Sequence, residues 1–188
     1  MKHILFVDAC PRKSSRTRQL ATAYLDSIKQ DNEVEYLNLF EYDLKPFDEE
    51  KVELRENCCK NRVFDDPMFD FAKQLQNADE LVIAAPVWDL SFPSLLKVYI
   101  EYINVVGFTF YYGQDGHPQS LLKLQRLDYI TTSVGPCPNG GLGFAYIKAV
   151  FESFYNLKDV RLHYANGLDI IGADVDAILA KAKKEILK

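Results

Sequence analysis

The chain has 188 residues, of which 48% are hydrophobic and 26% are charged, and its formal net charge at pH 7 is -5. This composition is that of an ordinary globular protein, and the length suits one domain, residues 1–188, with a core of its own. The negative charge argues against a nucleic-acid-binding surface, and no apolar run approaches the ~20 residues of a membrane span. The start MKHILFVD lacks the features of a secretory signal. We therefore expect a cytoplasmic protein with reduced cysteines and with neither nucleic acid nor membrane as a partner.

Apolar runs bounded by polar residues predict five strands in chain order, at residues 3–9, 33–40, 80–88, 126–135 and 160–168. Apolar residues recurring at three and four predict a helix after each strand, at residues 17–28, 68–75, 95–106, 144–156 and 174–187. Residues 41–62 are charged and aperiodic, and we expect them to cross the surface as an irregular excursion. Strands that alternate with helices require crossover connections. The pattern therefore predicts an α/β fold, a doubly wound five-stranded parallel sheet with helices on both faces.

Three connecting segments differ in composition from ordinary connectors. They follow the first, third and fourth predicted strands and read CPRKSSRT, PVWDLSFP and SVGPCPNGG. In doubly wound sheets, ligands bind beyond the carboxyl ends of the strands, at the point where the strand order reverses. We therefore expect these three loops to converge on one site.

The first loop opens a helix, so its free backbone N–H groups and the positive end of the helix dipole offer an anion site. Hydroxyl groups and cations strengthen this site, and they belong to Arg12, Ser14, Ser15, Arg16 and Thr17. The same residues also fit a serine-capped helix with solvated arginines and no ligand. Both readings stay open at this point.

Read as C-x5-R-T, the same loop also fits a low-molecular-weight cysteine phosphatase, with Cys10 as the thiolate and Arg16 as the phosphoryl clamp. Against this reading, Pro11 has no N–H to donate, and the stretch PRKSS contains no glycine to let successive amides turn inward. No Asp-Pro general acid appears late in the chain. We keep the phosphatase as an alternative, but a cysteine that ends a buried strand is more often a small packed residue.

The other two loops can accommodate a planar ligand. The second carries the only tryptophan, Trp88, which either borders a flat heteroaromatic ring or seals the loop. The third, from Ser133 to Gly143, has four glycines and two prolines in eleven residues, which allows close backbone approach to a ligand but equally suits a mobile turn. Cys58 and Cys59 have no nearby histidine, so we expect plain loop residues there and no metal site.

Taken together, the loops resemble those of the flavodoxin-like, FMN-dependent NAD(P)H:quinone oxidoreductases and NADH-azoreductases. The stretch PVWDLSFPSLLKVYIEYINVVGFTF is similar to that family's P-M-Y-N-F-x-I-P-x-x-L-K followed by a helix and G-x-T-F. The matching residues are Pro86, Trp88, Pro93, Leu96, Lys97, Gly107, Thr109 and Phe110. A weaker likeness runs from the first strand to ANGLD at residues 165–169.

The resemblance implies a homodimeric enzyme that uses FMN to carry two electrons from NADH or NADPH to a small aromatic acceptor, a quinone or an azo compound, in alternating half-reactions. It implies no obligate catalytic side chain. The cofactor-binding residues that it implies are Cys10, Ser15, Arg16 and Thr17 at the phosphate, Pro86, Val87, Trp88, Asp89 and Leu90 along the ring, and Ser133, Val134 and Gly135 at its pyrimidine edge. The broad apolar face of residues 95–106 would serve the homodimer interface. Candidate walls for the acceptor are Phe108, Phe110, Tyr111 and Tyr112, of which we expect at least two to be core residues.

Four positions depart from the family pattern. Cys10 replaces the usual serine, Asp89 replaces the usual asparagine, Leu90 replaces an aromatic residue, and Pro136 stands where a second glycine is common. A carboxylate near the ring would disfavour an anionic reduced flavin by like-charge repulsion. A flavin-binding module without turnover is therefore a third hypothesis.

Overall fold

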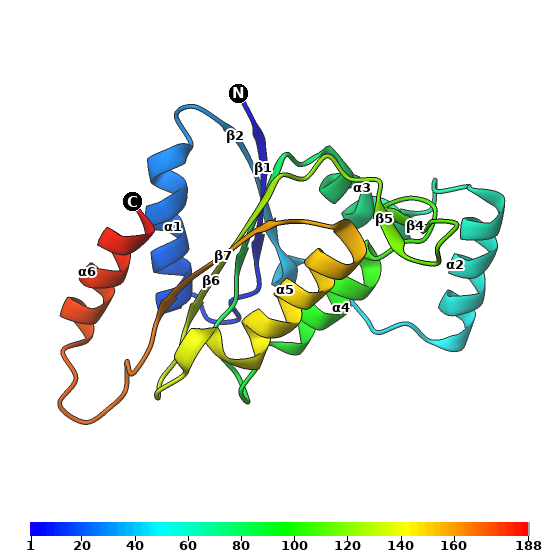
Figure 1. The fold of residues 1–188 in the computed structure, drawn as a ribbon. Coiled ribbons are helices and arrows are strands. Elements are labelled where there is room, and N and C mark those ends of the chain that lie inside the picture. Colours follow the sequence, from blue (N-terminus) through cyan, green and yellow to red (C-terminus); the bar gives the residue numbers. More distant parts are fainter. Residues whose placement is uncertain (188) are drawn as a thin grey trace.

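The computed structural model describes residues 1–187, and its main element is a five-stranded parallel sheet with the strand order β2-β1-β3-β6-β7 (Figure 1). Its strands are β1 (His3–Asp8), β2 (Glu33–Asn38), β3 (Glu80–Ala84), β6 (Arg126–Thr132) and β7 (Asp159–Ala165). The α-helices are α1 (Arg16–Ile28), α2 (Glu49–Asn61), α3 (Asp70–Asn77), α4 (Ser94–Ile103), α5 (Gly141–Tyr155) and α6 (Val175–Ile186). The strand order reverses between β1 and β3, which confirms the predicted doubly wound α/β fold.

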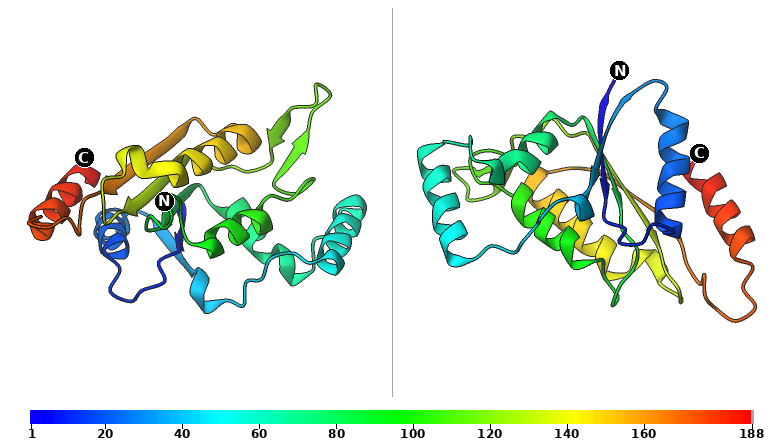
Figure 2. Two further views of the ribbon diagram at one scale, coloured as in Figure 1. Left: turned by 90° about the horizontal axis from the view of Figure 1, so that it is seen from below. Right: turned by 180° about the vertical axis from the view of Figure 1, so that it is seen from behind.

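Helices cover both faces of this sheet (Figure 2). In β1, Ile4 and Phe6 pack in the core under α1 and α6, whereas Leu5 and Val7 pack in the core under α3, α4 and α5. Because successive side chains of a strand point to opposite faces, a strand covered on both sides reads as a continuous apolar run. Within residues 1–187, none of the helices combines the length and the apolar character needed to span a bilayer.

The broad apolar face of residues 95–106 is mostly used inside the chain. In α4, Leu96, Tyr99, Ile100 and Ile103 are buried in the same core as α3 and α5. Val106, just beyond the helix, is the exposed member of the set. The width of this face is therefore explained by internal packing, and it gives no independent argument for a second subunit.

We expected residues 41–62 to be irregular, but they contain the helix α2. Asp48 caps this helix by accepting a hydrogen bond from the N–H of Lys51, and Arg62 ends it in the left-handed conformation. None of the residues of α2 is fully buried, so the helix has no apolar stripe that a periodicity argument could detect. Cys58 and Cys59 consequently lie on a helix and not in a loop.

A small antiparallel hairpin that the sequence did not predict joins β4 (Phe110–Tyr112) to β5 (Pro118–Ser120). Phe110 is buried against Phe154, and Phe108 packs against the main core. Two of the four aromatic residues proposed as walls thus have core contacts, whereas Tyr111 and Tyr112 are exposed.

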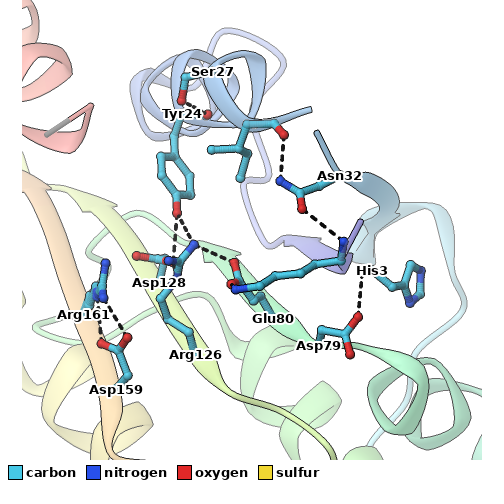
Figure 3. A network of polar contacts seen from close by, with 12 residues as sticks. His3, Tyr24, Ser27, Asn32, Asp79, Glu80, Arg126, Asp128, Asp159 and Arg161 are labelled. Carbon is cyan, nitrogen blue, oxygen red and sulfur yellow. Dashed lines mark hydrogen bonds and ion pairs between the residues drawn. The ribbon is translucent and has the colours of Figure 1, made fainter. Parts of the chain in front are cut away.

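A polar network lies near the amino ends of β3 and β6, on the side of the sheet that α1 covers (Figure 3). The carboxylate of Asp128 is 1% exposed and accepts hydrogen bonds from Tyr24 (3.0 Å) and Arg126 (2.8 Å), with Nε2 of His163 at 2.7 Å. Burial alone would raise the pKa of Asp128, but the contacts with His163 and Arg126 outweigh it and lower the pKa. Through Tyr24, this network holds the C-terminal half of α1 on the sheet.

Candidate functional site

A cleft of about 540 Å³ lies at the carboxyl ends of β1, β3 and β6. Three of the segments that line it are the three loops predicted from composition, so their convergence on one site is confirmed. A fourth segment, which follows β7, contributes Leu168 and Asp169. The lining residues that sequence reasoning did not assign to a cofactor are Pro11, Arg12, Ser14, Thr132, Leu168 and Asp169.

Nine of the twelve predicted cofactor-binding residues line this cleft, namely Ser15, Arg16, Thr17, Pro86, Val87, Trp88, Asp89, Ser133 and Val134. The other three, Cys10, Leu90 and Gly135, are not among its lining residues. Gly135 lies beside it, where its carbonyl group accepts hydrogen bonds from the hydroxyl of Ser133 (2.7 Å) and the N–H of Gly167 (3.1 Å). Phe108, Phe110, Tyr111 and Tyr112 do not line the cleft either.

One end of the cleft is rich in free N–H groups. Ser15 is the N-cap of α1 and accepts the N–H of Arg18 at 3.3 Å. The N–H groups in the first turn of a helix have no intrahelical acceptor, and here they belong to Arg16 and Thr17. Within the described part of the chain, no hydrogen bond uses the N–H groups of Arg12 and Ser14, which line the cleft, or of Lys13, which stands between them in the chain. These donors, together with the helix dipole, form an anion site.

Two contacts join the segments around this anion end. Nη1 of Arg16 lies 2.5 Å from Oδ1 of Asp169, and both side chains are partly exposed. The Oγ1 atoms of Thr17 and Thr132 lie 2.6 Å apart in a buried hydrogen bond. The first contact ties the start of α1 to the segment after β7, and the second ties it to the end of β6.

Cys10 is 1% exposed, and its Sγ lies 3.5 Å from the carbonyl oxygen of Ala84. Burial, and secondly the charge of Asp8, raise the pKa of the Cys10 thiol to about 12. The thiol is therefore protonated at neutral pH, and the arginine that a phosphatase needs, Arg16, is held by Asp169. This arrangement lacks the thiolate nucleophile on which the phosphatase alternative depends.

A tight turn at residues 88–91 contributes Trp88 and Asp89 to the lining of the cleft. Trp88 and Ser91 exchange two backbone hydrogen bonds of 3.1 and 2.7 Å. Between them, Asp89 and Leu90 both have a positive φ, +47° and +67°, as in the turns that usually carry asparagine and glycine. The carbonyl group of Leu90 also accepts the N–H of Leu142 (3.0 Å), which fixes the turn against the start of α5.

The lining suits a planar molecule that carries a phosphate group. Free N–H donors belong to the loop after β1, and the apolar side chains that line the cleft include Val87, Trp88 and Val134. The volume lies within the range of roughly 300–1,000 Å³ that small-molecule sites occupy. Among the described residues that line the cleft, none is a histidine, cysteine or lysine. The carboxylates of the cleft belong to Asp89 and to Asp169, and Asp169 is paired with Arg16. Apart from these two residues, the described side chains of the cleft are suited to holding a reactive group and offer no general acid or base.

Comparisons with known proteins find relatives along the whole chain. A family model described as flavodoxin-like fold matches residues 2–188. The chain is 31% identical, over 195 residues, to the FMN-dependent NADH:quinone oxidoreductase of Coprothermobacter proteolyticus, and the match covers 98% of this chain and 96% of the relative. It is 32% identical, over 192 residues, to the protein of the same name from Clostridium beijerinckii, with 97% and 94% covered.

Solved structures show the same fold. An FMN-dependent NADH-azoreductase of Bacillus anthracis in complex with FMN has a TM-score of 0.83 at 25% identity, with 100% of this chain and 96% of that chain covered. An azoreductase from the same organism has a TM-score of 0.87 at 21% identity, with 100% and 97% covered.

Proposed function

Because the chain belongs to the flavodoxin-like fold family that its FMN-dependent NADH:quinone oxidoreductase relatives share, we propose that it is an FMN-dependent oxidoreductase. In this proposal it passes two electrons from NADH or NADPH to quinones, azo compounds or related aromatic acceptors. The observation that carries the proposal is that one cleft combines the anion site after β1 with the apolar lining residues Val87, Trp88 and Val134, all on loops of the same sheet. One sheet carries these loops, and we propose that residues 1–188 act as one domain.

In this proposal the first loop holds the FMN phosphate through its free N–H groups and through Ser15, Arg16 and Thr17. The ring lies along residues 86–89, and its pyrimidine edge reaches Ser133 and Val134. Cys10 contributes by packing beneath the loop, because its side chain is buried.

When bound, FMN supplies the two-electron redox chemistry that the side chains of the cleft do not have. The chain's own groups bind the phosphate, orient the ring and border the space beside it. Donor and acceptor use this one cleft in turn, so the reaction proceeds in alternating half-reactions. No residue is assigned the role of an obligate acid or base.

The proposal includes a homodimer and a cytoplasmic location. Apolar side chains stay exposed in the lining of the cleft and beside it, namely Trp88 and Val134 in the lining and Leu90 and Leu142 next to it. A second copy that covered them would remove this apolar surface from water. Sedimentation velocity of the purified protein tests the dimer.

The four cysteines are free thiols, as a reducing compartment requires, and cell fractionation tests the location.

Absorbance spectroscopy tests the function directly. We expect the purified protein, alone or after addition of FMN, to show a band at about 450 nm that bleaches when NADH is added without air, because the flavin takes up two electrons. A band that does not bleach with NADH or NADPH would indicate a flavin-binding module without turnover. If saturating FMN does not bind, the proposed function is wrong.

A further inference from the structure

Arg18 does not line the cleft, but its side chain binds the backbone of the loop after β1, which does. Its Nη1 donates to the carbonyl groups of Arg12 (2.6 Å) and Lys13 (3.2 Å), and its Nη2 donates to the carbonyl group of Cys10 (2.6 Å). Its Nε donates to the carboxylate of Asp8. All three nitrogen atoms of the guanidinium group are thus engaged with the end of β1 and with the loop that follows.

Asp8 completes this arrangement from the end of β1. It is largely buried, and its Oδ1 accepts the N–H of Cys10 at 2.8 Å, while its Oδ2 receives Arg18. Both polar groups of the Cys10 backbone are therefore fixed, the N–H by Asp8 and the carbonyl by Arg18.

We propose that Arg18, anchored by Asp8, is a positioning residue that makes this loop a phosphate cradle. It draws the carbonyl groups of Cys10, Arg12 and Lys13 away from the cleft and so leaves the N–H groups of the loop for an anion. This inference deepens the proposed function and rests on it, since the anion is the phosphate of FMN.

Electrostatics explains why the loop needs such a residue. An anion is attracted by N–H groups and repelled by carbonyl oxygens, so a loop that binds phosphate must turn its peptide groups with the N–H side inward. Loops of this kind commonly use glycine for that purpose, but residues 10–17 contain none. The peptide orientation is instead imposed from behind, by a guanidinium group that also adds positive charge behind the loop.

The fork of donors on an arginine matters more here than its charge. A lysine has one compact ammonium group and cannot reach three separate carbonyl groups and a carboxylate in this geometry. Arg18→Lys therefore keeps the charge and removes most of the positioning. Asp8→Asn keeps an acceptor for the N–H of Cys10 and removes the charged anchor of Arg18.

A matched control lies on β7. Arg161 makes the same kind of contact with Asp159, with Nε and Nη2 each donating to the carboxylate at 2.7 Å. Neither residue lines the cleft. Arg161→Lys therefore makes the same chemical change at an arginine–aspartate pair that holds no loop of the site.

The experiment compares FMN with riboflavin, which has the same ring and no phosphate. Dissociation constants for both are measured by flavin fluorescence in the apo forms of wild type, Arg18→Lys, Asp8→Asn and Arg161→Lys. We expect Arg18→Lys to weaken FMN binding about tenfold, the scale of one lost charge-assisted contact, and to change riboflavin binding less than about twofold. Asp8→Asn should lower the FMN preference in the same direction, and Arg161→Lys should leave both constants unchanged.

Two results would overturn the proposal: FMN binding that is unchanged in Arg18→Lys, or FMN and riboflavin binding that fall by the same factor. The second result would mean that Arg18 only supports the fold. If circular dichroism shows that Arg18→Lys or Asp8→Asn does not fold, the other variant tests the proposal. Its ratio of the FMN and riboflavin dissociation constants is then compared with that of the wild type. A wild-type protein that binds neither flavin would instead contradict the proposed function.

Discussion

The buried hydrogen bond between Thr17 and Thr132 offers a quantitative test of how the cleft is held together. It joins the first turn of α1 to the last residue of β6, with 2.6 Å between the Oγ1 atoms. Thr17→Val keeps the shape of the side chain and removes the hydroxyl. We expect it to lower the free energy of unfolding by about 1.5 kcal/mol. The hydrogen bond is lost, and the hydroxyl group of Thr132, which is nearly buried, is left without a partner.

The same substitution in the partner residue, Thr132→Val, should cost a similar amount of unfolding free energy, because it leaves the fully buried hydroxyl group of Thr17 without a partner. The double variant leaves neither hydroxyl without a partner, so we expect it to cost only about 1 kcal/mol. The two substitutions should therefore be strongly non-additive, with a coupling energy of about 2 kcal/mol.

Urea denaturation of the apo proteins, followed by circular dichroism, measures these values. Thr131→Val is the control, since Oγ1 of Thr131 is buried and makes no hydrogen bond with any described residue. Removal of this hydroxyl group should leave the free energy of unfolding unchanged or raise it. Costs of Thr17→Val and Thr132→Val that add within about 0.5 kcal/mol, or a Thr131→Val that costs as much as either, would show that the Thr17–Thr132 hydrogen bond does not stabilise the cleft in this way.

Three further predictions concern other parts of the chain. Cys10→Ser should keep FMN affinity within about twofold, because this residue packs beneath the loop, and neither protein should hydrolyse aryl phosphates; a hydrolase activity that the substitution abolishes would contradict this. Gly141→Ala should cost at least about 2 kcal/mol in urea denaturation, since φ of +68° and ψ of -163° lie in a region that essentially only glycine adopts, and the new Cβ would lie 2.7 Å from the Cys137 sulfur. Gly116→Ala, with a φ of +76° and open space around it, should cost about 1 kcal/mol, and equal costs would contradict the larger penalty at Gly141. Asp128→Asn should cost about 3 kcal/mol at pH 7, where the wild-type carboxylate is charged and paired. Because the folded pKa of Asp128 lies below the ordinary 3.8, this difference should be fully present above pH 3.8 and shrink as the pH falls further; a gap that stays constant down to pH 2 would contradict the assignment.

The regular elements could be predicted where they bury a regular face. The strand β1 reads as an apolar run because both of its faces are covered, and α1 shows both a serine cap and an apolar stripe. The helix α2 gave no such signal, because none of its residues is fully buried and its start depends on the single cap Asp48. The hairpin strands β4 and β5 have three residues each, too few to establish an alternation.

The site could be predicted at the level of segments, but not of individual contacts. Spacing places Arg18 on the polar side of α1, yet its side chain folds back onto the carbonyl groups of the preceding loop. Asp169 reaches Arg16 only because β7 ends beside β6, a fact of sheet order and not of local sequence. The dipeptide formed by Asp89 and Leu90 gave no turn signal, since residues with a positive φ are usually glycine or asparagine.

The turn at residues 88–91 keeps a leucine in the left-handed region, a conformation that costs a residue with a Cβ about 1–2 kcal/mol. The side chain of Leu90 is 68% exposed, so little packing compensates for that cost. Laboratory evolution toward heat resistance should therefore reach this position early, with glycine or asparagine as the favoured replacements. Leu90 itself does not line the cleft, but Trp88 and Asp89 of the same turn do. A replacement that relaxes the turn would therefore also shift these two residues, so that thermal stability is gained at the expense of activity.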